Sequence, residues 1–165
     1  MPAEDIIKHL GLEPLPGEGG YYREVYRSED LAGNPGDRYS GMRSFSTAIY
    51  YLLTQTTFSH LHRLKSDEVY HYYTGDPVEM LLLYPDGLGK TVVLGCAMEI
   101  GQNPMFVVPK GTWQGTKLIQ GGSWALMGTT VSPGFDFEDY EQGIREDLIA
   151  DFPLYSDMIR ALTHE

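Results

Sequence analysis

Two histidines and a glutamate lie close together in the middle of the chain. One residue separates His60 from His62, and five residues separate His62 from Glu68. Side chains two positions apart in a β-strand point to the same face, so we expect the two imidazoles to project together. A turn over residues 65–67 would return Glu68 on a neighbouring strand, where its carboxylate could approach both rings.

This set has two chemical interpretations. Two imidazoles and a carboxylate can hold a divalent transition metal, such as Fe, Mn, Ni or Zn, and leave coordination positions open for a substrate. The same side chains could instead form a hydrogen-bonded polar cluster that lines a metal-free pocket or is solvated at the mouth of a barrel. The residue types leave both interpretations open.

A metal-free pocket would still be equipped for acid–base chemistry. An imidazole oriented by a carboxylate can remove a proton next to a carbonyl group, and a hydroxyl across the cavity can supply one. We therefore expect His62 to act as the base and Glu68 to orient it. Tyr70 is the candidate acid, with Tyr50 and Tyr72 as alternatives. Packing is the competing role for these tyrosines, because aromatic residues are common in β-proteins.

Short apolar runs and turns alternate through the region that must position these residues. The runs with the composition of strands are residues 21–27, 43–53, 68–73, 78–84, 91–94, 105–108, 116–119 and 124–131. Clusters of Gly, Pro, Asn and Asp separate many of them, as turns require. Short strands at these intervals, with no helix between them, favour an antiparallel sandwich or barrel over βαβ units.

Helical periodicity is confined to the two ends of the chain. Residues 3–12 carry apolar side chains at helical spacing, and Gly11 is a natural stop. Near the other end, apolar positions that include Tyr140 and Leu148 predict helices over about residues 137–163. We expect these helices to pack on the outside of the barrel.

The length of the chain suits one folded domain better than two, because 165 residues can bury one full hydrophobic core. No linker, internal repeat or low-complexity segment divides the sequence. We therefore predict a single all-β domain over residues 1–165, with a barrel over about residues 20–132 and short helices at both ends.

Two segments resemble the motifs of the cupin superfamily. His60-x-His62 followed by Glu68 is similar to the first cupin motif, with one residue more than usual between histidine and glutamate. Residues 109–114, Pro-Lys-Gly-Thr-Trp-Gln, resemble the second motif. Gln114 stands where that motif usually supplies the last metal-binding histidine.

More narrowly, the chain is similar to the DUF985 family of cupins. The matching segments are residues 19–24, 62–63, 66–68, 71 and 131–137, and the resemblance spans about residues 5–145. It implies a double-stranded β-helix, or jelly-roll barrel, of the kind found in sugar-nucleotide epimerases and seed storage proteins. It also implies a homodimer, and it brings no established activity.

The resemblance adds Gln114 to His60, His62 and Glu68 as a candidate metal ligand. A glutamine oxygen binds borderline transition metals less well than imidazole does, so the expected metal site is weakened. One hypothesis is an enzyme acting on a small polar metabolite such as a sugar nucleotide, either as an epimerase or isomerase or with a metal. The other is a barrel that binds or stores a small ligand without turnover.

Composition limits the partners. A formal net charge of −11 disfavours nucleic acid, whose binding depends on a basic surface. No stretch approaches the roughly 18 apolar residues of a membrane-spanning helix, so we expect no membrane partner. The acidic start, Met-Pro-Ala-Glu-Asp, lacks the basic and apolar regions of a secretory signal, which predicts a cytoplasmic location.

Four arginines lie among the predicted barrel strands. They are Arg23, Arg27, Arg43 and Arg63. One or two of them could hold a phosphate or carboxylate of a ligand. Ion pairing with the acidic residues that follow residue 136 is the favoured role, because the segment from Asp136 to Glu165 carries nine acidic residues.

Overall fold

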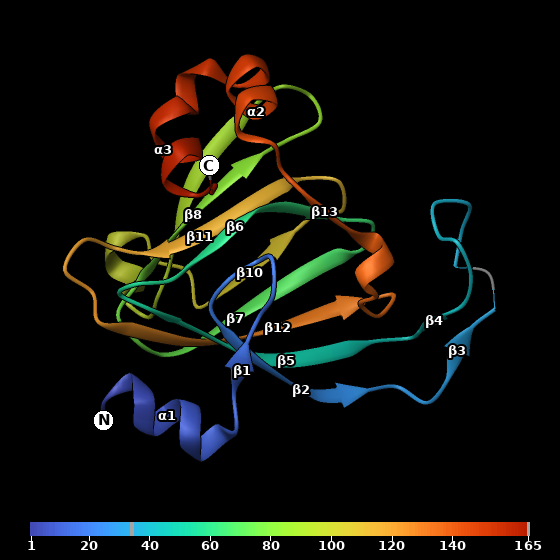
Figure 1. Cartoon of the computed structure of the whole chain (residues 1–165), viewed down its shortest axis with the longest axis horizontal. Coiled ribbons are helices and arrows are strands. Elements are labelled where there is room, and N and C mark those ends of the chain that lie inside the picture. The colour runs from blue at the N-terminus through green and yellow to red at the C-terminus, as the bar shows by residue number, and fades with distance from the viewer. Residues whose placement is uncertain (34, 165) are drawn as a thin grey trace.

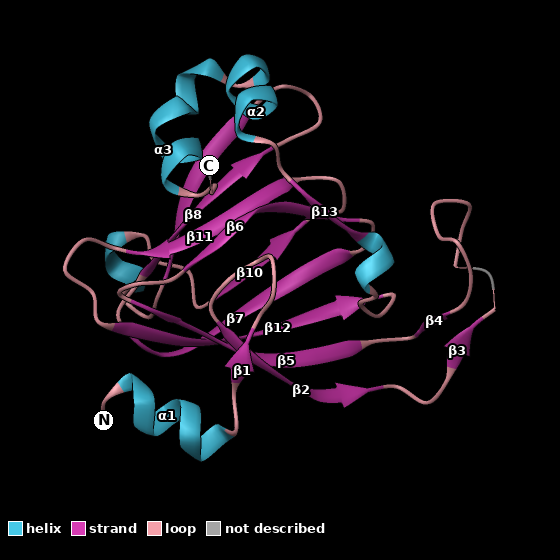
Figure 2. Cartoon of the chain, in the orientation of Figure 1, coloured by secondary structure: helices cyan, strands magenta, loops and turns pink. Residues whose placement is uncertain are grey.

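Antiparallel strands dominate the structure, a computed structural model that describes residues 1–33 and 35–164 (Figures 1 and 2). The larger sheet has the strand order β1 (Glu13–Pro14), β2 (Tyr21–Arg27), β5 (Thr47–Thr54), β12 (Trp124–Ser132), β7 (Asp67–Gly75) and β10 (Met105–Val108). The smaller sheet has the order β13 (Tyr140–Gln142), β6 (Phe58–Leu64), β11 (Trp113–Leu118), β8 (Val78–Leu83) and β9 (Gly89–Leu94). The predicted all-β jelly-roll barrel is confirmed.

A short pair of strands, β3 (Leu31–Ala32) and β4 (Arg43–Ser44), forms a separate two-stranded sheet. Figure 1 shows this arm standing away from the two main sheets at the right of the view. Three 3-10 turns complete the connections: η1 (Met98–Ile100), η2 (Phe137–Asp139) and η3 (Pro153–Tyr155).

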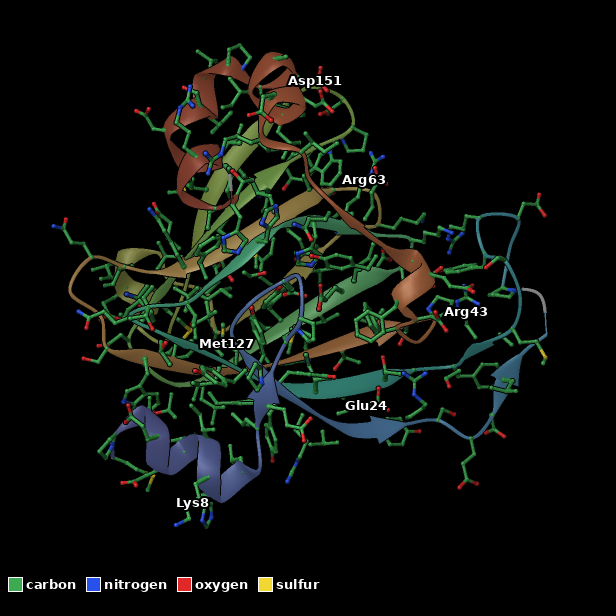
Figure 3. The ribbon with its side chains drawn as sticks, in the orientation of Figure 1. Lys8, Glu24, Arg43, Arg63, Met127 and Asp151 are labelled. Carbon is green, nitrogen blue, oxygen red and sulfur yellow. The ribbon has the colours of Figure 1, made fainter. Side chains whose placement is uncertain are left out.

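The interior between the two main sheets follows from the period of two along the strands. In β12, Ala125 and Met127 join an apolar core, whereas Thr129 and Val131 further along the same strand line a cavity. β5 repeats the pattern in the opposite direction, since it is antiparallel to β12. One end of the barrel is therefore filled with apolar side chains and the other is hollow. Figure 3 labels Met127 towards the filled end and Glu24 towards the other.

Helices cover the outer faces of both sheets. α1 (Ala3–Leu10) ends at Gly11 in the left-handed conformation, with φ of 61°, and its Ile6 packs against the larger sheet. α2 (Arg145–Asp151) and α3 (Ser156–Ala161) pack on the smaller sheet through an outer apolar cluster. The expected packing outside the barrel is thus confirmed. None of the described helices is long and apolar enough to cross a membrane.

Tyr140 departs from its predicted place on a helix. Residues 140–142 form β13, in which Tyr140 pairs with Leu64 of β6, and the helix begins only at Arg145. The edge of β6 offers unpaired backbone groups, and pairing with them satisfies more hydrogen bonds than a short isolated turn of helix would. This places Tyr140 at the wall of the barrel instead of on its outside.

Candidate functional site

The hollow end of the barrel encloses a cavity of about 410 Å³. Its lining residues are Leu15, Pro16, Glu18, Tyr22, Glu24, Arg27, Thr47, Ile49, Tyr51, His62, Leu64, Glu68, Thr129, Val131, Phe135, Asp136, Phe137 and Tyr140. Aliphatic and aromatic walls with a few converging polar groups are typical of a small-molecule site. His62 and Glu68, both expected in a pocket, line it.

His62 lies on β6 with 1% of its surface exposed, and its two ring nitrogens have different roles. Nδ1 lies 2.7 Å from the carbonyl oxygen of His60, which can only accept, so Nδ1 carries the proton. Burial lowers the pKa of His62 and keeps the ring neutral. The unprotonated Nε2 lies 3.9 Å from Oε2 of Glu18. This nitrogen is therefore available as a base.

Glu18 comes from the loop between β1 and β2, and the sequence did not mark it as a site residue. Its Oε1 accepts a hydrogen bond of 2.8 Å from Ser59. Burial raises the pKa of Glu18 from 4.5 to about 7, although the neighbouring hydroxyl groups of Ser59 and Tyr51 act in the opposite direction. Near neutral pH a large fraction of this carboxyl group therefore keeps its proton beside His62.

The position of Glu18 depends on a tight loop that glycines make possible. Gly19 has φ of 98°, and a Cβ on it would lie 2.4 Å from the carbonyl oxygen of Phe58. The carbonyl oxygen of Glu18 accepts a hydrogen bond from the backbone of His60 at 2.8 Å, which joins the loop to β6. Pro-Gly-Glu-Gly-Gly at residues 16–20 was the available signal, because a carboxylate among glycines points to a backbone in close contact with another strand.

Glu68, 6% exposed, lies on β7 across from the imidazole. Its Oε2 accepts a hydrogen bond of 2.8 Å from Nε2 of Gln114, so these two predicted site residues are brought together. Burial raises the pKa of Glu68, and the attraction of His62 opposes that rise. No hydrogen bond joins Glu68 to His62 among the described residues. The backbone carbonyl of His60 orients the imidazole, so the orienting role expected for Glu68 is corrected.

His60 does not share the cavity with His62, which corrects the expectation that their rings point together. β6 carries a β-bulge here, because Gln114 pairs with His62 while Thr116 pairs with Ser59. The extra residue breaks the period of two. Nε2 of His60 lies 3.1 Å from the carbonyl oxygen of Gly143, and Nδ1 accepts from the backbone of His164 at 3.3 Å. Both nitrogens of His60 are thus engaged in holding the C-terminal segment.

The tyrosines are arranged differently from the prediction. Tyr70 is 1% exposed and belongs to the apolar core, outside the lining of the cavity. Tyr51 lines the cavity, and its hydroxyl donates to the carbonyl of Gly19 at 2.9 Å. Tyr140 stacks on His62, with ring centroids 5.1 Å apart, and within the described structure its buried hydroxyl has no hydrogen-bond partner. Both were missed, since their contacts depend on the loop before β2 and on β13.

The four arginines are held by acidic or aromatic side chains. Arg43 forms a buried pair with Asp139 at 2.7 and 2.8 Å, and Arg63 pairs with Glu141 at 2.7 and 2.8 Å. These two confirm the expected pairing with the acidic segment after residue 136. Arg27, at the cavity, is bound by Glu24 through Nε and Nη2 at 2.9 and 2.8 Å. Arg23 lies over the ring of Tyr50.

Comparison with known protein families establishes the family to which this chain belongs. A family model described as Cupin superfamily (DUF985) matches residues 4–143. The chain belongs to this DUF985 family of cupins. An uncharacterised Saccharomyces cerevisiae protein, YML079W, is 31% identical to it over 145 residues, which are 82% of this chain and 69% of the yeast protein.

Some solved structures are similar to this chain over almost its full length. A Shewanella oneidensis protein has a TM-score of 0.88 and 37% identity, covering 99% of this chain and 98% of its own. A hypothetical protein from Leishmania major has a TM-score of 0.91 and 33% identity, with 100% of both chains covered. Bacillus subtilis oxalate decarboxylase, at 16% identity and a TM-score of 0.55 over 92% of this chain and 37% of that one, shares the fold alone.

The metal site expected from the cupin motifs does not fit the side chains present. His60 is turned to Gly143 and His164, and Gln114 directs its amide nitrogen, a donor group, at Glu68. Across residues 1–33 and 35–164, no group of three His, Cys, Asp or Glu side chains is arranged to hold a metal ion. The oxygen of Gln114 is buried and, in this part of the chain, unpaired. The site is better described by its acid–base groups.

Proposed function

We propose that this cupin is an acid–base enzyme of the isomerase type, which moves a proton on a small polar metabolite held in the cavity. His62 would be the base and Glu18 the acid. The observation that carries the proposal is the 3.9 Å approach of His62 Nε2 to Glu18 Oε2 in the wall of an enclosed cavity. A neutral imidazole and a protonated carboxyl group in contact are the pair that such chemistry needs.

The proposed step is a proton transfer next to a carbonyl group. A carbon–hydrogen bond of the substrate breaks and its proton moves to Nε2 of His62, while the electron pair forms a carbon–carbon double bond. The carbonyl oxygen takes the proton of Glu18, which leaves an enol, an imidazolium and a carboxylate. When the carbon that loses its proton also carries a hydroxyl group, this enol is an enediol. The imidazolium of His62 then adds its proton to the former carbonyl carbon, while the carboxylate of Glu18 takes the proton of the other hydroxyl, which becomes the new carbonyl. The neutral pair is restored and the isomerisation is complete.

The surroundings of the pair support this assignment. The imidazolium formed during the step would face the carboxylates of Glu18 and Glu68, whose attraction stabilises positive charge on His62. Apolar side chains such as Ile49, Leu64 and Val131 line the same cavity and limit the access of water. Electrostatic interactions in such a site are stronger than they are in bulk water.

Hydrogen–deuterium exchange tests the proposal without knowledge of the product. The protein is incubated in D₂O with a panel of small carbonyl metabolites, including sugar nucleotides, and exchange at carbon is followed by NMR. We expect exchange with at least one compound. Both His62→Gln and Glu18→Gln should slow it by about a hundredfold or more, the usual contribution of a general acid or base.

A surface variant provides the control. Glu141→Gln alters an exposed residue that pairs with Arg63 outside the cavity, and exchange should be unchanged. Exchange that persists in His62→Gln would remove the base from the mechanism. Thermal stabilisation by a compound that undergoes no exchange would favour the second candidate, a barrel that binds a ligand without turnover.

We also propose that the chain forms a homodimer. The arm made by β3 and β4 carries large apolar side chains that are mostly exposed in the single chain: Leu31 at 51%, Met42 at 60% and Phe45 at 55%. Exposed apolar groups that cluster on one element are typical of an interface. A second copy that covered them would also hold the arm in place.

A further inference from the structure

The lining of the cavity is acidic, and the side chain of Arg27, which carries a positive charge in this lining, already has hydrogen-bond partners within the protein. Among the described residues that line the cavity, Glu18, Glu24, Glu68 and Asp136 carry carboxyl groups, whereas Arg27 is the one lysine or arginine. Arg27 gives two hydrogen bonds to Glu24 and a third, of 3.0 Å, to the carbonyl of Phe135. An anionic ligand would have to displace these partners.

The inner wall is also rich in hydrogen-bond acceptors. Nε2 of His62, a residue with 1% exposure, has an unshared pair because Nδ1 carries the proton, and no hydrogen bond from the described residues reaches it. One oxygen of Glu18 is occupied by Ser59 and one oxygen of Glu68 by Gln114. Thr129 also contributes a hydrogen bond to the carboxyl group of Glu68. A carboxylate has about four lone-pair sites, so Glu68 can still accept hydrogen bonds from a ligand, and Nε2 of His62 remains unpaired.

Aromatic rings complete this environment. Tyr140 stacks on His62 with its hydroxyl buried and without a hydrogen-bond partner in the described residues, and Tyr51, Tyr22 and Phe135 line the same space. The faces of aromatic rings attract cations, most strongly where water is excluded. An ammonium group has three donors and no acceptor, so it complements both the acceptors and the rings.

We infer that the ligand of this cavity is a primary amine, bound as its ammonium ion by Glu68 and the ring of Tyr140, with its apolar part against the walls and with Nε2 of His62 left free to act as the base. This inference rests on the proposed function in that it takes the same cavity as the substrate site, and it names the class of substrate. Glu68 supplies the neutralising charge, which leaves the carboxyl group of Glu18 as the acid.

Calorimetry with matched probes tests this inference. The amine probes are phenethylamine and hexylamine, their uncharged counterparts are phenethyl alcohol and hexanol, and the anionic counterpart is hydrocinnamate. We expect both amines to bind about tenfold more tightly than their alcohols, as a charge-assisted hydrogen bond to a carboxylate would give. Hydrocinnamate should bind more weakly than either class.

Variants of Glu68 test whether its charge causes the preference for amines over alcohols. Glu68→Gln keeps an oxygen that can accept from Gln114 and removes the charge, so the preference for amines over alcohols should disappear. Glu141→Gln, on the surface, should keep it. Melting temperatures of both variants establish that they fold, and Glu68→Asp, which retains the charge, should retain part of the preference if Glu68→Gln proves unstable.

Several outcomes would overturn the inference. They are equal binding of amines and alcohols, tighter binding of hydrocinnamate, an amine preference that survives in Glu68→Gln, or no binding of either amine at millimolar concentration. None of these affects the exchange experiment. Deuterium exchange into an uncharged or anionic compound, and into no amine, would support the acid–base proposal and contradict the inference that the substrate is an amine.

Discussion

At the scale of single residues, the protonation states of His62 and Glu18 are set by the groups that hydrogen-bond to them and by their burial. The carbonyl of His60 fixes the proton of His62 on Nδ1, and Ser59 binds the carboxyl group of Glu18. Burial then moves the two pKa values in opposite directions, downwards for His62 and upwards for Glu18. Base and acid are thereby kept in their working forms close to neutral pH.

The pH dependence of the proposed activity follows from these shifts. The working form needs His62 neutral and Glu18 protonated, so exchange should fall below the lowered pKa of His62 and above a pH of about 7. We expect a bell-shaped profile when the exchange rate is measured against pH. A rate that stayed constant above pH 7 would contradict the role of Glu18.

Ser59→Ala should shift the high-pH side of this pH–rate profile, where Glu18 loses its proton. The hydrogen bond from Ser59 lowers the pKa of Glu18, so its removal raises that pKa and shifts the decline in rate to higher pH. The control is Ser132→Ala, since the hydroxyl of Ser132 bonds to Ser46 and is exposed. A purely structural effect of Ser59 would lower the rate at every pH and leave the profile unshifted.

Glu18→Gln should make the protein more stable at high pH. The pKa of Glu18 is higher in the folded chain than its ordinary 4.5, so its contribution to stability is full below pH 4.5 and is lost as the pH rises through about 7. A shift of this size corresponds to about 3 kcal/mol. Urea unfolding should show the variant more stable than the parent above pH 7, and equal stability there would contradict the burial argument.

Much of this residue-scale arrangement could not be predicted from sequence. His62 and Glu68 were found because strand period and motif spacing are local properties. Glu18 and Tyr140 reach the cavity through a loop and an edge strand, and their contacts with His62 depend on pairings between distant segments. The displacement of His60 depends on a bulge defined only by the register of β6 against β11.

At the scale of elements, the loop between β1 and β2 decides where the acid lies. Gly19→Ala would require a side chain at φ of 98° and at 2.4 Å from the carbonyl of Phe58, so we expect a loss of roughly 3 kcal/mol of stability. The substitution should also displace Glu18 and thereby abolish deuterium exchange at carbon. Urea unfolding and NMR measure the two effects.

Gly121→Ala is the matched control for this loop. Gly121 has φ of 86°, yet a Cβ on it would have no atom of the described residues within 4 Å, so only the conformational cost of about 1 kcal/mol applies. Exchange should be kept. If both variants lost the same stability, contact with Phe58 would not be what restricts Gly19.

The regular elements were predicted well, and those fixed by distant pairing were not. β2 and β10 have the predicted bounds, and α1 ends at the predicted glycine, because turn residues and periodicity mark these positions. β13 was predicted as helix, since the spacing of Tyr140 and Leu148 also fits a helix and the edge of β6 is invisible in the sequence. Cys96 is exposed just after β9, although the apolar run of residues 92–97 favours burial.

At the scale of the whole molecule, the barrel separates a filled end that provides stability from a hollow end that holds the proposed chemistry. Light scattering tests the proposed dimer, for which we expect twice the 18.5 kDa of one chain. Phe45→Glu, at an exposed position of the arm, should yield monomers of unchanged fold. A parent protein of 18.5 kDa at micromolar concentration would contradict the dimer.

His60 joins the C-terminal segment to the base. Its ring contacts Gly143 and His164, while its carbonyl holds the proton of His62. Movement of the segment that contains His164 would therefore rotate the peptide that orients the imidazole. A substitution that shifts the backbone at His164 should therefore change the orientation of the base, although His164 is not among the residues that line the cavity.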